Sequence, residues 1–206
     1  MVEASEIAEK IHGEHHGAHS AEADANFRKF TGIYLGIAAM LLAITALGGA
    51  HATKTIVNSN IQASDTYGFY QARNIRQTAY QIAAEQLEAD LVAQPGMPEA
   101  ARAKIEQLAK RYRDRVERYE SDPKTGEGKK ELLEKAKGLE ARRDHAAERD
   151  PNFDYAEALF QIAIVLGSVS IVAASRPLVS LSGILAVGGT LLMLNGYFLF
   201  VHLPLE

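Results

Sequence analysis

One stretch of the sequence decides the fold. Residues 30–50 read FTGIYLGIAAMLLAITALGGA, without a single charged side chain. Two later stretches, Ala156 to Ala174 and Leu178 to Leu203, are also mostly apolar. Each has about the 20 residues that a helix needs to cross roughly 30 Å of hydrocarbon. The sequence therefore predicts three transmembrane helices, with membrane lipid as their solvent.

The rest of the sequence is polar. Residues 1–29 form a tail rich in Ala, Glu and His, and residues 51–155 carry 18 basic and 18 acidic side chains. This balance argues against a basic surface for nucleic acid. The absence of cysteine excludes disulfide bonds, thiolate metal ligands and cysteine nucleophiles. We expect a polar, His-rich N-terminal tail and a charged helical domain outside the membrane.

Breaks containing proline and glycine divide the charged segment. Pro95-Gly96-Met97-Pro98 ends one long helical stretch, and a second turn runs from Ser121 to Gly128. Helices are predicted over residues 56–92, 98–119 and 129–148. The sequence leaves open whether the first transmembrane helix continues into the helix that begins at Ile56.

Two further proline-containing motifs flank the second transmembrane helix. Asp150-Pro151-Asn152 is predicted to cap a separate helix that enters the membrane near Ala156. Ser175-Arg176-Pro177 is predicted to form a tight turn between the last two membrane helices. The fold class is therefore all-α: three transmembrane helices, with an extramembrane helical hairpin of coiled-coil character inserted between the first and the second.

Small residues recur at four-residue spacing in the first membrane helix. Gly32 and Gly36 form one such pair, and Ala39 and Ala43 form another. This spacing flattens one helix face, so that a second helix can approach closely. The alternative is that glycine and alanine are simply common in membrane helices.

An apolar stripe follows in the charged segment, with spacings of three, four and seven residues. Its members are Ile61, Gly68, Ala72, Ile75, Ala79 and Ile82. A heptad-like stripe is typical of a supercoiled contact between helices. Together with the small residues of the membrane helix, it predicts an interface between copies of the chain, and therefore a homo-oligomer.

Histidines form the best candidate metal site. The cluster is His12, His15, His16 and His19; if the tail were helical, three of these imidazoles would share one face, and neutral imidazole binds zinc, nickel and copper. Gly13 and Gly17 weaken such a helix, so the site would be weak and poorly selective. The other hypothesis is a solvated tail. No cofactor is predicted beyond this metal.

The membrane stretches carry few polar side chains. Asn195 lies deep in the third stretch, and an unpaired amide is costly in hydrocarbon. Gln161 and Ser168 of the second stretch are its predicted partners. No set of acid, base and nucleophile converges anywhere in the sequence, so we do not expect an enzyme.

Basic residues predict the orientation. Arg28 and Lys29 precede the first membrane helix, and Arg176 lies in the tight turn. Three crossings place these positions on one side, and positive charge favours the cytoplasm. In a bacterial inner membrane, the N-terminus would then be cytoplasmic and residues 51–155 periplasmic.

The order of these parts is similar to a known family. Asn58-Ser59-Asn60-Ile61-Gln62-Ala63-Ser64-Asp65 and Phe69-Tyr70-Gln71-Ala72-Arg73-Asn74-Ile75-Arg76-Gln77-Thr78 resemble domain-of-unknown-function family 4337. The resemblance implies a bacterial protein with three membrane spans and an extramembrane helical segment, and it implies no activity. It draws attention to a polar stripe beside the apolar one, which is either a specific interface or a solvated face. The polar stripe consists of Asn60, Ser64, Tyr67, Gln71, Asn74 and Thr78.

Two functional hypotheses follow from the sequence. The first is a self-associating inner-membrane protein with a structural or scaffold role. The second is an oligomeric channel, or a transport-accessory protein for ions or metals, that uses the His-rich tail. The sequence specifies neither a small-molecule ligand nor the number of copies.

Overall fold

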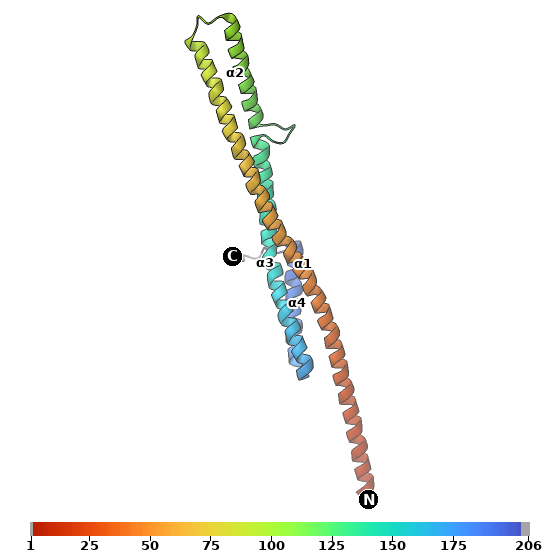
Figure 1. The fold of residues 1–206 in the computed structure, drawn as a ribbon. Helices are drawn as coiled ribbons and strands as arrows, with labels where there is room; N and C mark the ends of the chain where they lie inside the picture. Colours follow the sequence, from red (N-terminus) through yellow and green to blue (C-terminus); the bar gives the residue numbers. More distant parts are fainter. Residues whose placement is uncertain (1, 203–206) are drawn as a thin grey trace. The chain divides into compact units, whose positions relative to one another are not determined.

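The computed structural model describes residues 2–202, and the side chains from Ala25 onward. All its elements over this range are helices, which confirms the all-α prediction (Figure 1). They are α1 (Val2–Ala93), α2 (Glu99–Glu120), α3 (Lys129–Ala173) and α4 (Arg176–Phe198). Helix α1 is unbroken, so Gly48 and Gly49 do not separate the first membrane stretch from the helix that follows it.

The chain divides into two compact units. The apolar unit comprises Met1–Thr53 and Ala147–Glu206, and the charged unit comprises Lys54–Ala146. Helices α1 and α3 contribute residues to both units, α2 belongs to the charged unit, and α4 belongs to the apolar unit.

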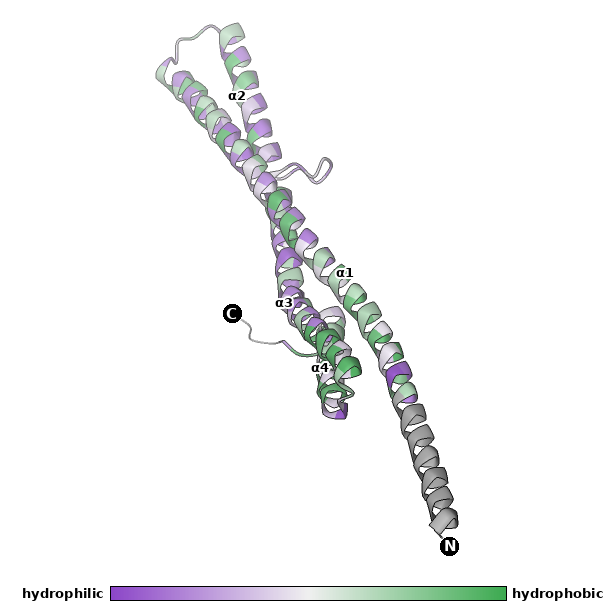
Figure 2. Cartoon of the chain, turned by 60° about the horizontal axis from the view of Figure 1, so that its bottom comes forward, coloured by the Kyte–Doolittle hydropathy of each residue, from purple (hydrophilic) through white to green (hydrophobic). Residues whose placement is uncertain are grey.

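Three helical segments are long and apolar enough to cross a membrane. They are Ala25–Ala93, Lys129–Ala173 and Arg176–Phe198, with mean hydropathies of 2.1, 1.9 and 1.9 in their most apolar windows. Only 17–28% of these windows is buried within the chain. So much exposed apolar surface is unfavourable in water, whereas it is compatible with the hydrocarbon of a lipid bilayer. Figure 2 shows the hydrophobic residues gathered on α4 and on the C-terminal part of α3.

The core of the apolar unit lies where α3 and α4 meet. It consists of Ala156, Phe160, Ala163, Ala186 and Met193. The hydroxyl groups of Tyr34 and Ser182 lie 2.8 Å apart, and Ser182 donates a 2.5 Å hydrogen bond to the Ala163 carbonyl. These contacts connect α1, α4 and α3 through polar groups that are satisfied within the protein, as hydrocarbon requires.

Helix α3 corrects the predicted boundary at Asp150-Pro151-Asn152. The helix runs from Lys129 through Pro151 to Ala173, so no separate helix begins there. Tertiary contacts hold both sides of the proline. Thr53 donates a hydrogen bond to the Asp150 carboxylate at 3.1 Å, and Asn152 is almost completely buried. Such contacts offset the missing backbone donor of a proline, which by itself tends to break a helix.

Helix α4 ends at Phe198, before residue 203, where the sequence predicts the end of the last apolar helix. Leu199 adopts the left-handed conformation with φ of 49°, and its N–H donates to the Asn195 carbonyl. The Asn195 side chain then binds the backbone of Val201 at both its N–H and its carbonyl group. A side-chain amide thus replaces the next helical turn, which hydropathy alone does not reveal.

In the charged unit, α2 runs beside the last part of α1 (Figure 1). The Tyr80 ring of α1 contacts the rings of Tyr112 and Tyr119 of α2, with centroids 5.4 and 5.8 Å apart. Arg113 forms a two-pronged ion pair with Glu88. The breaks predicted around residues 95–98 and 121–128 are both present.

Candidate functional site

The predicted interface residues of α1 are exposed in each of the two units. We call Gly32, Gly36, Ala39 and Ala43 the small-residue face, and Ile61, Gly68, Ala72, Ile75, Ala79 and Ile82 the seam. All ten residues are exposed. The three isoleucines of the seam remain 54%, 69% and 50% exposed. The described part of the chain therefore leaves both surfaces largely uncovered.

The glycines of α1 fall into two groups, according to whether a neighbouring segment leaves room for a side chain. A Cβ atom placed on Gly32, Gly36 or Gly68 would meet no heavy atom within 4 Å apart from the adjacent backbone of its own helix. A Cβ atom placed on Gly48 would lie only 2.5 Å from the Phe153 ring. Internal packing thus explains Gly48 but not the glycines of the small-residue face and the seam. Glycine inside a helix costs about 1 kcal/mol relative to alanine.

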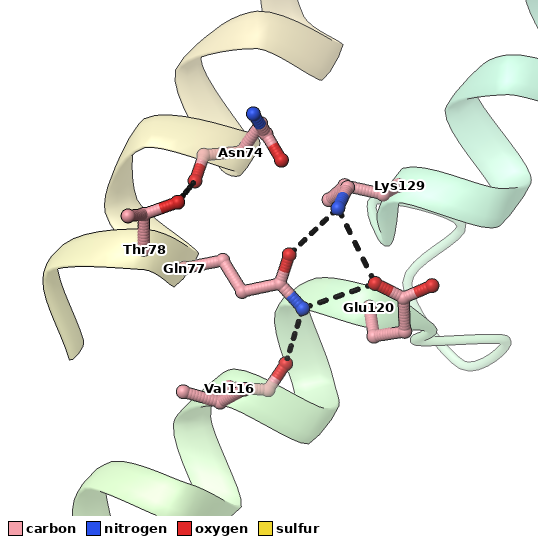
Figure 3. A network of polar contacts seen from close by, with 6 residues as sticks. All are labelled: Asn74, Gln77, Thr78, Val116, Glu120 and Lys129. Atoms are coloured by element: carbon pink, nitrogen blue, oxygen red, sulfur yellow. Dashed lines mark hydrogen bonds and ion pairs between the residues drawn. The ribbon is translucent and has the colours of Figure 1, made fainter. Parts of the chain in front are cut away.

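A different face of α1 packs within the charged unit. Ala63, Thr66, Gln77 and Ala84 are buried. Gln77 is at the centre of a polar network that connects three helices (Figure 3). Its side-chain nitrogen donates to the Val116 carbonyl at 3.2 Å and to the Glu120 carboxylate at 3.0 Å.

Lys129, the first residue of α3, completes this network. Its ammonium group donates to the side-chain oxygen of Gln77 at 2.7 Å and to Glu120 at 3.3 Å. The hydrogen bond from Gln77, helped by Lys129, holds the pKa of the Glu120 carboxyl below its usual value. The network fixes α1, α2 and α3 in register. Sequence reasoning missed it, because an isolated glutamine within a helix gives no pairing signal.

The predicted polar stripe lies mostly at the surface. Asn60, Ser64, Gln71, Asn74 and Thr78 are exposed, and Tyr67 is half-buried. Thr78 donates a hydrogen bond to the Asn74 carbonyl of its own helix (Figure 3). Burial and a hydrogen bond to Glu140 raise the pKa of the Tyr67 hydroxyl.

Asn195 is buried, but its partners are not those predicted. Its side-chain nitrogen donates to the side-chain oxygen of Asn152 at 2.8 Å. Gln161 instead donates to Glu157, and Ser168 to the Ile164 carbonyl of its own helix. The prediction that Gln161 or Ser168 pairs with Asn195 is therefore wrong. Both lie on the exposed side of α3, while Asn152 lies on the side that packs against α4.

Phe153 fills the space next to this asparagine pair. Its side chain is 1% exposed, and its ring meets the Tyr197 ring edge-on at 5.0 Å. Cβ atoms placed on Gly48 and Gly196 would lie within 3.0 Å of its atoms. The Tyr197 hydroxyl donates to the Ile44 carbonyl at 3.0 Å, which connects α4 to α1. One aromatic side chain thus determines where small residues are required on two other helices.

The predicted metal ligands His12, His15, His16 and His19 lie outside the residues whose side chains are described. Among the described side chains, no group of three or more His, Asp or Glu residues is arranged to hold a metal ion. His202 lies 3.7 Å from the Glu148 carboxylate. These two residues make one ion pair when the histidine is protonated, and they do not make up a group of three ligands.

Taken together, these features define an all-helical protein with three helices capable of spanning a membrane and a charged helical unit. The family model described as Domain of unknown function (DUF4337) matches residues 27–199. The chain belongs to this family, as its resemblance in sequence indicated. The comparisons with curated proteins and with solved structures return no match.

Proposed function

We propose that this chain is a self-associating membrane protein with a structural or scaffold role, and that the seam is the contact between copies. One observation supports this above all: every seam residue is exposed on α1, while other faces of the same helix are buried. Full burial of an isoleucine side chain contributes about 1.5–3 kcal/mol, and more than half of the surface of the seam isoleucines is on average still available for burial. Three exposed isoleucines per copy are therefore a substantial driving force.

The shared membrane topology of the copies favours a parallel contact at the seam. Ile61, Gly68, Ile75 and Ile82 recur every seven residues, as in a left-handed supercoil. Copies inserted in one membrane with the same topology are related by an axis along the membrane normal, so equivalent helices run in the same direction. Each residue then faces its own counterpart. Gly68 allows the closest approach, because it carries no side chain.

Asp65 is the one charged residue in this repeat. Asp65 lies four residues after Ile61. Ala72 and Ala79 occupy the equivalent position in the next two heptads, four residues after Gly68 and Ile75. Asp65 is exposed, and it forms no ion pair among the described residues. In a parallel contact two Asp65 carboxylates would face each other and repel. A single polar residue at such a position lowers affinity while fixing the register.

The proposed setting is the bacterial inner membrane, with the N-terminus in the cytoplasm. Residues 51–155 would form a helical hairpin domain in the periplasm, built on the contacts between α1, α2 and α3. The support is the positive charge of Arg28, Lys29 and Arg176. A reporter fused after Glu206 and active only in the periplasm should give a signal. A signal from a reporter active only in the cytoplasm would reverse this orientation.

Chemical cross-linking in native membranes tests the interface. Ile75→Asp places a carboxylate in the seam, and we expect at least tenfold fewer cross-linked copies. Val92→Asp is the matched control, because Val92 is an exposed apolar residue of α1 beyond the seam. Asp65→Ala should increase the cross-linked fraction by removing the repulsion. Monomers alone in the unmodified protein, or equal losses in both Asp variants, would refute the proposed interface.

A further inference from the structure

Apart from the seam, the charged unit has a second notable surface, where several arginine side chains lie close together. A cavity of about 330 Å³ lies between α1, α2 and the loop after α2. Its lining includes Arg73 of α1 and Arg111, Arg115 and Arg118 of α2. The three arginines of α2 are spaced by four and three residues, so they project from one face of the helix. This volume lies within the range of small-ligand sites.

Tyrosine rings hold two of these guanidinium groups in place. Arg73 lies over the Tyr119 ring and Arg115 over the Tyr80 ring, each 5.3 Å from the ring centroid. Tyr80 and Tyr119 stack on each other, which makes a continuous support. A guanidinium group that stacks on an aromatic ring still has its N–H groups available, in the guanidinium plane, to donate hydrogen bonds to a ligand. Arg115 is therefore ordered before a ligand arrives, which lowers the entropy cost of its contribution to binding.

Among the described residues, only one of the four arginines that line the cavity forms an ion pair. Arg73 pairs with Glu127. Within the described structure, Arg115 donates only to the Tyr80 hydroxyl, at 3.3 Å. In the part of the chain that the structure describes, Arg111 and Arg118 form no ion pair or hydrogen bond. Asp114 and Asp122 also line the cavity, so it carries four positive and three negative groups.

We propose that this cavity binds a phosphate-class oxyanion, held mainly by Arg111 and Arg118 with Arg115 beside them. A tetrahedral phosphate offers enough acceptor oxygens for two-pronged bonds with more than one guanidinium group. Asp114 and Asp122 weaken the positive potential for every anion, so the preference for phosphate over chloride rests on the two-pronged hydrogen bonds, which a spherical ion cannot form. The ligand is either free phosphate or the phosphate of a lipid headgroup, because both present the same oxygens. This inference does not depend on self-association.

Calorimetry on the full chain in maltoside micelles tests the site. The probes are inorganic phosphate, glycerol phosphate, and micelles that also contain phosphatidylglycerol. We expect saturable binding of at least one probe with a dissociation constant below about 1 mM. The Arg111→Gln/Arg118→Gln variant should bind that probe at least tenfold more weakly. Neither arginine has a partner in the described structure, so this variant should keep the helical content of the unmodified chain.

The matched control is the Arg102→Gln/Arg142→Gln variant, which removes the same charge away from the cavity. It should bind as the unmodified chain does. Binding of inorganic phosphate identifies a free ion as sufficient, whereas binding only of the lipid-containing micelles identifies a headgroup. The absence of binding to all three probes overturns the proposal. Equal weakening in the two double variants also overturns it, because net charge alone would then account for the binding.

Discussion

The contact between Gly48 and Phe153 offers a direct test of how the apolar unit packs. In Gly48→Ala, the new Cβ atom would lie 2.5 Å from Cε1 of Phe153. The Phe153 ring would have to move by roughly 1 Å to restore an ordinary contact. It has little room to do so, because a Cβ atom on Gly196 would already lie 2.9 Å from the same ring.

The expected magnitude follows from two opposing effects. Overpacking of this kind costs about 1–3 kcal/mol. Alanine gains about 1 kcal/mol over glycine in a helix. We therefore expect Gly48→Ala to lower the free energy of unfolding by up to about 2 kcal/mol. Gly183→Ala is the control: nothing lies within 4 Å of its new Cβ atom, so it should gain about 1 kcal/mol.

Titration with sodium dodecyl sulfate, followed by far-ultraviolet circular dichroism, measures both variants in the same micelles. The double variant Gly48→Ala/Phe153→Ala isolates the contact, because the overpacking cost disappears with the ring. We expect a coupling energy of about 1–3 kcal/mol between the two substitutions. If Gly48→Ala and Gly183→Ala stabilise the chain equally, Phe153 does not pack against Gly48.

Two further predictions concern buried and partly buried polar groups. Asn195→Leu removes the partner of Asn152, and the unsatisfied amide should cost about 1–3 kcal/mol. Asn152→Leu/Asn195→Leu should cost less than the sum of its single variants in the same titration. For Glu120, the folded-state pKa is depressed, so its contribution to stability is present above the ordinary value of 4.5. That contribution is lost as pH falls through the folded pKa. Glu120→Gln should therefore flatten the loss of stability on acidification, and an unchanged acid profile would mean that Gln77 and Lys129 do not stabilise the carboxylate.

The sequence predicts the elements of this fold better than their contacts. Length and hydropathy identify the three membrane stretches, because a helix needs about 20 apolar residues to cross a bilayer. The breaks at residues 95–98 and 121–128 follow from local backbone chemistry. The continuity of α3 through Pro151 is different. It depends on tertiary contacts from α1 and α4, which oppose the local preference of proline.

The candidate sites also divide into features that one helix determines and features that depend on contacts between helices. The apolar stripe of the seam can be identified from the sequence, because a stripe with a seven-residue repeat is a property of one helix. The partner of Asn195 was not predictable, since it depends on which side of α3 faces α4. The arginine cavity and the Gln77 network also require contacts between helices far apart in sequence. Hydropathy and spacing within a single helix carry no information about such pairs.

The measurement that tests self-association most directly is a single-cysteine scan of residues 60–83. The chain has no cysteine, so each variant carries one reactive thiol. Oxidation in native membranes should produce disulfide-linked copies with a period of about 3.5 residues. The maxima should fall at the seam and the minima at Ala63, Thr66 and Gln77, which the chain already buries. Maxima on the buried face, or a yield that does not vary along α1, would contradict an interface at the seam.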